Sequence, residues 1–113
     1  MNEKSVFVRF FGDYPIVKVL DFLIENRIFD YSKSEIAKGA KIGWSTLHLF
    51  WDKLEESKIV VPTRQIGRAK LFRLNTENPS VRSLINFGFN LAKQQARIEA
   101  MKSLEQEKVP VSV

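Results

Sequence analysis

The sequence has no cysteine and only one histidine. Without cysteine, disulfide bonds are excluded, as are catalytic and metal sites that depend on a thiolate. The single histidine, His48, has no second histidine and no carboxylate cluster at ligand spacing, so we expect no metal site. A phosphate-binding glycine loop, a dinucleotide-binding turn and a nucleophile elbow are missing as well. We therefore expect no catalytic site and no cofactor, and the sequence argues against an enzyme.

Long hydrophobic runs are also absent. No apolar segment approaches the roughly 18 residues that a membrane-spanning helix needs. No apolar segment near residue 1 is followed by a small-residue cleavage site, so secretion is not indicated. The 113 residues are 44% hydrophobic and 27% charged, which is ordinary for one globular domain with a modest core. These features predict a cytoplasmic protein with no membrane partner.

Negative charge is scarce in the middle of the chain. The net charge is +5, and residues 33–73 hold nine basic and four acidic residues, whereas the segments on either side are close to neutral. Residues 58–73 contain five basic residues and no acidic one. Such clustering is typical of a surface that contacts phosphates, although a solvated basic face is the other interpretation.

Residues 32–57 have the pattern of a helix-turn-helix. Ser32 and Glu35 have the spacing of a capping box, which predicts a short helix beginning there. Gly43 interrupts this helix, and a second one is expected over residues 43–57. Its apolar residues recur at helical spacing: Leu47, Phe50, Trp51 and Leu54. Two short helices joined by a tight turn are the outline of a helix-turn-helix.

Residues 60–74 predict a hairpin of two strands around a four-residue turn at 66–69. Pro62 cannot donate to a strand ladder, so its strand is expected at an edge of the sheet. The alternation of the return strand fails at Lys70 and Leu71, which predicts either a bulge or an edge solvated on both faces. A helix-turn-helix followed by such a hairpin, or wing, is a winged helix, and this fold points to duplex DNA.

The flanking segments complete an α+β, mainly α fold: a winged helix-turn-helix with a C-terminal dimerisation helix. The apolar segment 6–11 is either a strand or one helical turn, and residues 14–26 predict a core helix. A helix from residue 81 to beyond 101 would be roughly 30 Å long, too long for this domain to cover. We expect it to pair with a second copy, although a lone helix packed on its own domain is the alternative. The predicted dimerisation residues are Phe7, Phe10, Leu84, Phe87, Gly88, Leu91 and Ile98.

The expected division of the chain is a DNA-binding domain at 1–79, a dimerisation helix at 80–108 and a flexible tail at 109–113. Recognition helices contact base edges near their N-termini, and wings contact the flanking backbone or minor groove. The predicted DNA-binding residues are Lys33, Lys41, Trp44, Ser45, Thr46, His48, Arg64, Arg68 and Lys70. His48 is expected to donate to guanine or phosphate. For Trp44, packing against the turn is favoured over stacking or contact with a thymine methyl.

The string DYSKSEIAKGAKIGWSTLHLFWDKLEESKIV, followed by IGRAKLFRLNTENPSV, resembles a family of small archaeal winged-helix transcriptional regulators of the MarR/ArsR-like type. The resemblance covers residues 6–84, and its most specific pieces are FGD at 11–13, EIAKGAKIG at 35–43, GRAKLFRLN at 67–75 and NP at 78–79. It implies a cytoplasmic, usually dimeric DNA-binding protein. It also implies contacts by Ser45 and Thr46 at the helix start and by Arg68 and Lys70 on the wing. Trp44, His48 and Leu49 stand where more polar or basic residues are expected.

The leading hypothesis is therefore a sequence-specific, homodimeric transcriptional regulator that binds double-stranded DNA. The first alternative is an architectural or segregation-type protein that coats DNA without strong sequence preference. The second alternative is a protein-interaction module that does not bind DNA. No residue indicates a small-molecule effector.

Overall fold

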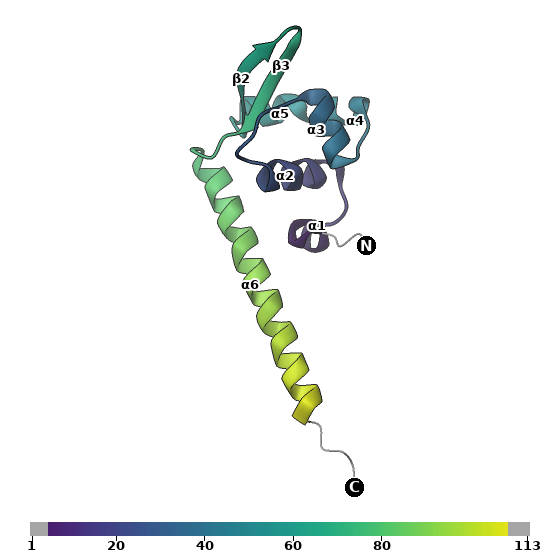
Figure 1. The fold of residues 1–113 in the computed structure, drawn as a ribbon, viewed down its shortest axis with the longest axis vertical. Helices are drawn as coiled ribbons and strands as arrows, with labels where there is room; N and C mark the ends of the chain where they lie inside the picture. The colour runs from purple at the N-terminus through teal and green to yellow at the C-terminus, as the bar shows by residue number, and fades with distance from the viewer. Residues whose placement is uncertain (1–4, 109–113) are drawn as a thin grey trace.

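The computed structural model describes residues 5–108 and contains six helices and three strands in this part of the chain (Figure 1). In chain order they are α1 (Val6–Phe11), α2 (Pro15–Glu25), β1 (Tyr31–Ser32), α3 (Lys33–Ala40), α4 (Trp44–His48), α5 (Trp51–Glu56), β2 (Val60–Ile66), β3 (Ala69–Leu74) and α6 (Pro79–Lys108). The strands form an antiparallel sheet in the order β1-β3-β2. The predicted fold class, a mainly helical winged helix with a long C-terminal helix, is confirmed. The predicted tail at 109–113 lies outside the described residues.

The core lies between α2, α3, α5 and the sheet. Its fully buried side chains include Val19, Ile36, Leu47 and Trp51. The predicted capping box is present: Glu35 N donates to Ser32 Oγ at 3.2 Å, and Ser32 N donates to Glu35 Oε1 at 2.8 Å. The capped start of α3 is therefore fixed directly after β1, beside the central strand.

The predicted single helix at 43–57 is wrong in one respect, because it is divided into α4 and α5. Phe50 has φ −131° and ψ 1°, and the amides of Leu49 and Phe50 donate to carbonyls only three residues back. Leu47, Trp51 and Leu54 are nevertheless buried, as their spacing predicts. The apolar spacing continues through the break, so hydrophobic periodicity alone does not reveal it.

The wing consists of β2 and β3, joined by the two-residue loop of Gly67 and Arg68. Gly67 has φ +60° while Arg68 has no positive φ, which is the pattern of a type II′ hairpin turn. The pairing register shifts between Pro62 and Arg64, so the predicted bulge is present, and the outer part of the wing, residues 62–66 and 69–70, is also exposed on both faces. The bulge allows Thr63 to stand outside the regular pairing with β3.

The start of α6 is tied to the end of α5 by two asparagines. The Asn75 and Asn78 amides each donate to the Lys58 carbonyl at 3.0 Å, and Asn78 also donates to the Ser57 carbonyl at 3.1 Å. Asn78 Oδ1 accepts from Ser80 N at 2.8 Å and so caps α6. These bonds set the direction in which the helix leaves the winged domain.

The first half of α6 packs against α1, which is a helix rather than a strand (Figure 1). A Cβ at Gly88 would collide with the Phe7 ring, so the absence of a side chain allows the close approach of these helices. Three of the predicted dimerisation residues, Phe7, Gly88 and Leu91, are thus buried within their own chain. Leu84 is half-buried.

The second half of α6 extends beyond α1, and the molecule measures 72 × 28 × 22 Å (Figure 1). Three apolar side chains on it are about half exposed: Ile98 at 46%, Met101 at 58% and Leu104 at 52%. Near α1, the rings of Phe10 and Phe87 are 5.6 Å apart and both remain exposed. No helix within residues 5–108 combines the length and the hydropathy needed to span a membrane.

Candidate nucleic-acid interface

A hollow of about 370 Å³ lies between the wing, the start of α3 and the start of α4. The residues that line it are Ser32, Lys33, Ser34, Trp44, Glu55, Arg68, Ala69, Lys70 and Phe72. Three of them, Lys33, Arg68 and Lys70, carry positive charge and come from two separate elements. Four residues that the sequence predicts to contact DNA, these three and Trp44, are therefore brought together.

Two buried aromatic rings support the charged side chains of the hollow. Trp51 and Phe72 meet edge to face with centroids 5.1 Å apart. The Lys33 ammonium lies 5.5 Å from the Trp51 centroid and 5.8 Å from that of Phe72, and the Lys70 ammonium lies 6.0 Å from Phe72. Cations at these distances are attracted to the ring faces. The same core pair thus positions both lysines.

Glu55 supplies the one acidic side chain of the hollow. Its Oε1 accepts a hydrogen bond from the Trp51 indole nitrogen at 2.6 Å. This bond satisfies the indole N–H, the only side-chain donor of a fully buried tryptophan. The sequence analysis did not identify Glu55 or Ser34 as part of the site. The place of Ser34 depends on the pairing of β1 with β3, which brings the start of α3 beside the wing and which a two-residue strand does not signal. Glu55 follows Trp51 by one turn of α5.

Trp44, the first residue of α4, does not pack into the turn as expected. Its side chain is 52% exposed, and its ring contacts the His48 ring with centroids 4.2 Å apart. Ser45 and His48 are exposed and Thr46 is half-buried, so the start of α4 presents the predicted contact residues to solvent. Leu49, which follows them, is 81% exposed.

The hydrogen bond of His48 determines which of its ring nitrogens carries a proton. Nδ1 lies 2.9 Å from the Trp44 carbonyl oxygen, and a carbonyl only accepts, so Nδ1 is the donor. In the neutral ring Nε2 is then an acceptor. Donation from His48 to guanine or phosphate, which the sequence analysis expects, therefore requires the protonated ring.

Arg64 does not line the hollow. Its Nε lies 2.9 Å from Asp30 Oδ2 and its Nη2 lies 3.2 Å from Oδ1, while Thr63 donates to the same carboxylate at 2.6 Å. The Arg64 guanidinium, followed by the Thr63 hydroxyl, lowers the pKa of Asp30 to about 2. In this conformation the charge of Arg64 is matched by Asp30 and is not directed toward a phosphate.

This pairing predicts a change in stability at acidic pH. Because the pKa of Asp30 is lower in the folded chain, its contribution to stability is complete above the ordinary value of 3.8 and is lost as pH falls toward 2. We expect the melting temperature of the wild-type protein to fall between pH 4 and 2, and that of Asp30→Asn to fall less over the same range. The effect should be small because the pair is exposed. Thermal unfolding followed by circular dichroism checks this, and an unchanged pH dependence in the variant would contradict it.

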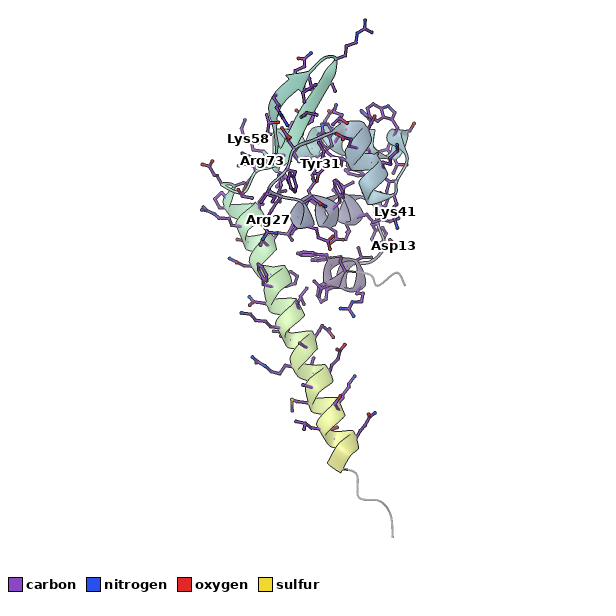
Figure 2. The ribbon with its side chains drawn as sticks, viewed as in Figure 1. Asp13, Arg27, Tyr31, Lys41, Lys58 and Arg73 are labelled. Atoms are coloured by element: carbon purple, nitrogen blue, oxygen red, sulfur yellow. The ribbon has the colours of Figure 1, made fainter. Side chains whose placement is uncertain are left out.

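Three other basic residues of segment 33–73 are divided between two regions. Lys41 ends α3 with φ 60° and ψ 45° and is exposed next to α4. Lys58 and Arg73 lie at the base of the hairpin, near the start of α6 (Figure 2). The basic residues that cluster in the sequence therefore lie only in part on the side of the hollow.

No protein-family model and no curated protein sequence matches this chain. Among solved structures, the chain is similar to Sso10a-2, a DNA-binding protein from Sulfolobus solfataricus. The two share 13% identity and a TM-score of 0.51 over 84% of this chain and 96% of that one. A second similar structure is MepR, a transcription regulator of the Staphylococcus aureus multidrug efflux pump MepA. Here identity is 19% and the TM-score 0.55, over 79% and 71% of the two chains.

A third is the adhesin competence repressor AdcR from Streptococcus pyogenes, with 13% identity and a TM-score of 0.51 over 80% of this chain and 65% of that one. At such identities the likeness concerns the fold alone. The archaeal origin implied by the sequence resemblance stays a prediction. The chain has the winged-helix fold found in these DNA-binding and transcription-regulator structures.

Proposed function

We propose that this protein is a sequence-specific transcriptional regulator that binds double-stranded DNA in the cytoplasm as a homodimer. The observation that supports this best is the convergence of Lys33, Arg68 and Lys70 on one hollow beside Trp44. These cations come from the start of one helix and from the wing tip, and a short exposed helix lies next to them. Such an arrangement can contact the phosphates of both strands of a duplex.

In this proposal α4 enters the major groove and the wing follows the flanking backbone or minor groove. Ser45 and Thr46 contact phosphates or base edges, while Lys41 reaches the backbone from the end of α3. Arg68, at the wing tip, and Lys70 neutralise phosphates and release counterions, which makes binding strongly dependent on salt. The region predicted as one recognition helix acts through α4, because α5 is turned into the core by Trp51 and Leu54.

Selection from a randomised duplex pool tests the proposed sequence specificity. We expect repeated selection at moderate salt to enrich a short, palindromic motif, because two identical subunits read two half-sites about 34 Å apart. Enrichment of no motif, together with equal affinity for unrelated duplexes, would contradict the proposal.

Nonspecific DNA binding is the second candidate, and one observation favours it. The exposed positions around α4 and α5 include Leu49, Asp52 and Glu56 and contain no arginine, asparagine or glutamine. Bidentate readout of guanine or adenine normally uses those three residue types. This candidate predicts a steep salt dependence that is the same for every duplex, whereas a footprint limited to one operator would exclude it.

The homodimer is proposed from the second half of α6. Apolar side chains on a helix that extends beyond its own domain require a covering partner, and a second copy offers a matching helix. The exposed members of the predicted dimerisation set, Phe10, Phe87 and Ile98, lie on or beside this helix. Phe7, Gly88 and Leu91 support the dimer indirectly, by packing α6 on α1.

Introducing a charge on this helix tests the dimer. Ile98→Glu is expected to weaken self-association by about 100-fold, because an unpaired carboxylate would be buried between the two copies. Sedimentation equilibrium measures the change, and DNA affinity should fall with it because two linked half-site contacts become one. Ala100→Glu is the matched control, since it adds the same charge about 200° around the helix. Equal self-association of both variants would place the dimer contact elsewhere.

A further inference from the structure

The solvent-facing side of the α4 region carries two large apolar side chains where a DNA-reading helix usually has long polar ones. Trp44 is 52% exposed and Leu49 is 81% exposed. Residues 44–49 contain no arginine, asparagine, glutamine or lysine. Yet Trp44 lines the same hollow as Lys33, Arg68 and Lys70. An aromatic side chain exposed among cations is well placed to contact the apolar part of a polyanion.

The Trp44 ring is held in place before any ligand arrives. The His48 ring lies against it at a centroid distance of 4.2 Å, with 53° between the ring planes. The hydrogen bond from His48 Nδ1 to the Trp44 carbonyl, 2.9 Å long, fixes the histidine in turn. A side chain that is already ordered loses little conformational entropy on binding.

The same hydrogen bond determines what His48 offers to a ligand. Because Nδ1 donates to the Trp44 carbonyl, Nε2 of the neutral ring is a hydrogen-bond acceptor. The α4 region therefore combines an apolar contact, from Trp44 and Leu49, with the Nε2 acceptor of His48. A matching ligand presents a methyl or similar apolar group close to an N–H donor.

One base pair offers that combination in the major groove. An A·T pair exposes the C5-methyl group of thymine and the N6 amino group of adenine, whereas a G·C pair has no methyl. We propose that Trp44 and Leu49 contact thymine methyl groups and that His48 Nε2 accepts from adenine N6, so that the protein prefers A·T pairs under α4. This inference rests on the proposed DNA binding and specifies which feature of the duplex is read.

Replacing thymine by uracil tests it, because that change removes only the methyl group. Two duplexes of about 24 base pairs, one of A·T pairs and one with deoxyuridine for every thymidine, are compared by fluorescence anisotropy at one salt concentration. Burial of one methyl favours binding about fourfold, so one contact in each of two subunits predicts a loss of about 15-fold in the deoxyuridine duplex. A G·C duplex that contains 5-methylcytosine should bind the protein more tightly than the same duplex with cytosine.

Three variants assign the effect to Trp44 and Leu49. Trp44→Ala should lose part of the difference in affinity between the thymidine and deoxyuridine duplexes, and Trp44→Phe should lose less of it. Trp44→Ala combined with Leu49→Ala should bind both duplexes with equal affinity. Phe29→Ala is the matched control, because Phe29 is an aromatic side chain of similar exposure, 57%, that does not line the hollow. It should retain the full discrimination. Circular dichroism confirms that each variant folds.

The outcomes separate this inference from the proposed function. Equal affinity of the wild-type protein for the two A·T duplexes would overturn the inference while leaving DNA binding intact. Discrimination that is unchanged in Trp44→Ala would also overturn it. Failure to bind any of the duplexes would overturn the proposed function itself, and the reading of thymine methyl groups with it.

Discussion

Reversing two charges at the wing, Arg68→Glu together with Lys70→Glu, is expected to lower affinity for duplex DNA by about 100-fold or more at low salt. Both side chains line the hollow and both are exposed, so the change acts on the DNA-facing surface with little effect on folding. Each lost phosphate contact also lowers the slope of log affinity against log salt by about one. A homodimer carrying four reversed charges should therefore show a much weaker salt dependence.

Fluorescence anisotropy between about 50 and 200 mM salt measures both effects. The matched control is Arg82→Glu with Lys93→Glu, which changes the net charge equally at two exposed positions of α6, both about 140–160° around the helix from Ile98. Affinity should change little in the control, because these positions lie outside the hollow. A similar loss in both double variants would mean that net charge, rather than the wing, determines binding. Unchanged affinity in the wing variant would place the DNA contact elsewhere on the protein, whereas a wild-type protein without measurable DNA binding would favour a protein-interaction module.

Local sequence signals predicted most of the elements around the hollow. The Ser32 and Glu35 spacing located the start of α3, and the failed alternation at Lys70 and Leu71 predicted the irregularity in the hairpin. The apolar spacing from Leu47 to Leu54 correctly identified the buried side of α4 and α5. These features depend on residues within a few positions of one another, which is why sequence periodicity and turn chemistry reveal them.

Features that depend on distant contacts were not predicted. The pairing of β1 with β3 joins residues about 40 positions apart, and it places Lys33 beside the wing. The contact of Asp30 with Arg64 likewise spans 34 residues and directs the Arg64 guanidinium to a carboxylate outside the hollow. Nothing near Arg64 in the sequence marks it as paired, so charge clustering overestimated the number of cations that face the hollow.

The two tryptophans illustrate the same difference. Both occur in the helical segment that follows Gly43, but Trp51 is fully buried and Trp44 is half exposed. Trp51 continues the apolar stripe, so its burial follows from helical spacing. Trp44 stands at the first position of α4, where the helix has just begun and the apolar spacing places no constraint on the ring.

Replacing Trp51 by alanine should have the largest effect on stability of any single change considered. Its ring is fully buried, meets Phe72 edge to face, and donates to Glu55 at 2.6 Å. Removing a buried aromatic side chain costs about 3–5 kcal/mol, which is a large part of the stability of a small domain. We expect urea unfolding followed by circular dichroism to show this loss in the free energy of unfolding.

Trp44→Ala is the matched control for this change, because it removes the same side chain from a half-exposed position and should alter stability by about 0.5 kcal/mol or less. Trp51→Phe separates packing from hydrogen bonding: it retains an aromatic ring but loses the bond to Glu55, for an intermediate loss of about 1–3 kcal/mol. Equal stability of the two alanine variants would contradict the burial of Trp51.

Because the Trp51 and Phe72 rings also position Lys33 and Lys70, the folded fraction of Trp51→Ala should bind duplex DNA more weakly than wild type. The two tryptophans thus have different roles: Trp51 supports the cations of the hollow from the core, and Trp44 is exposed and, in the proposed complex, faces the major groove.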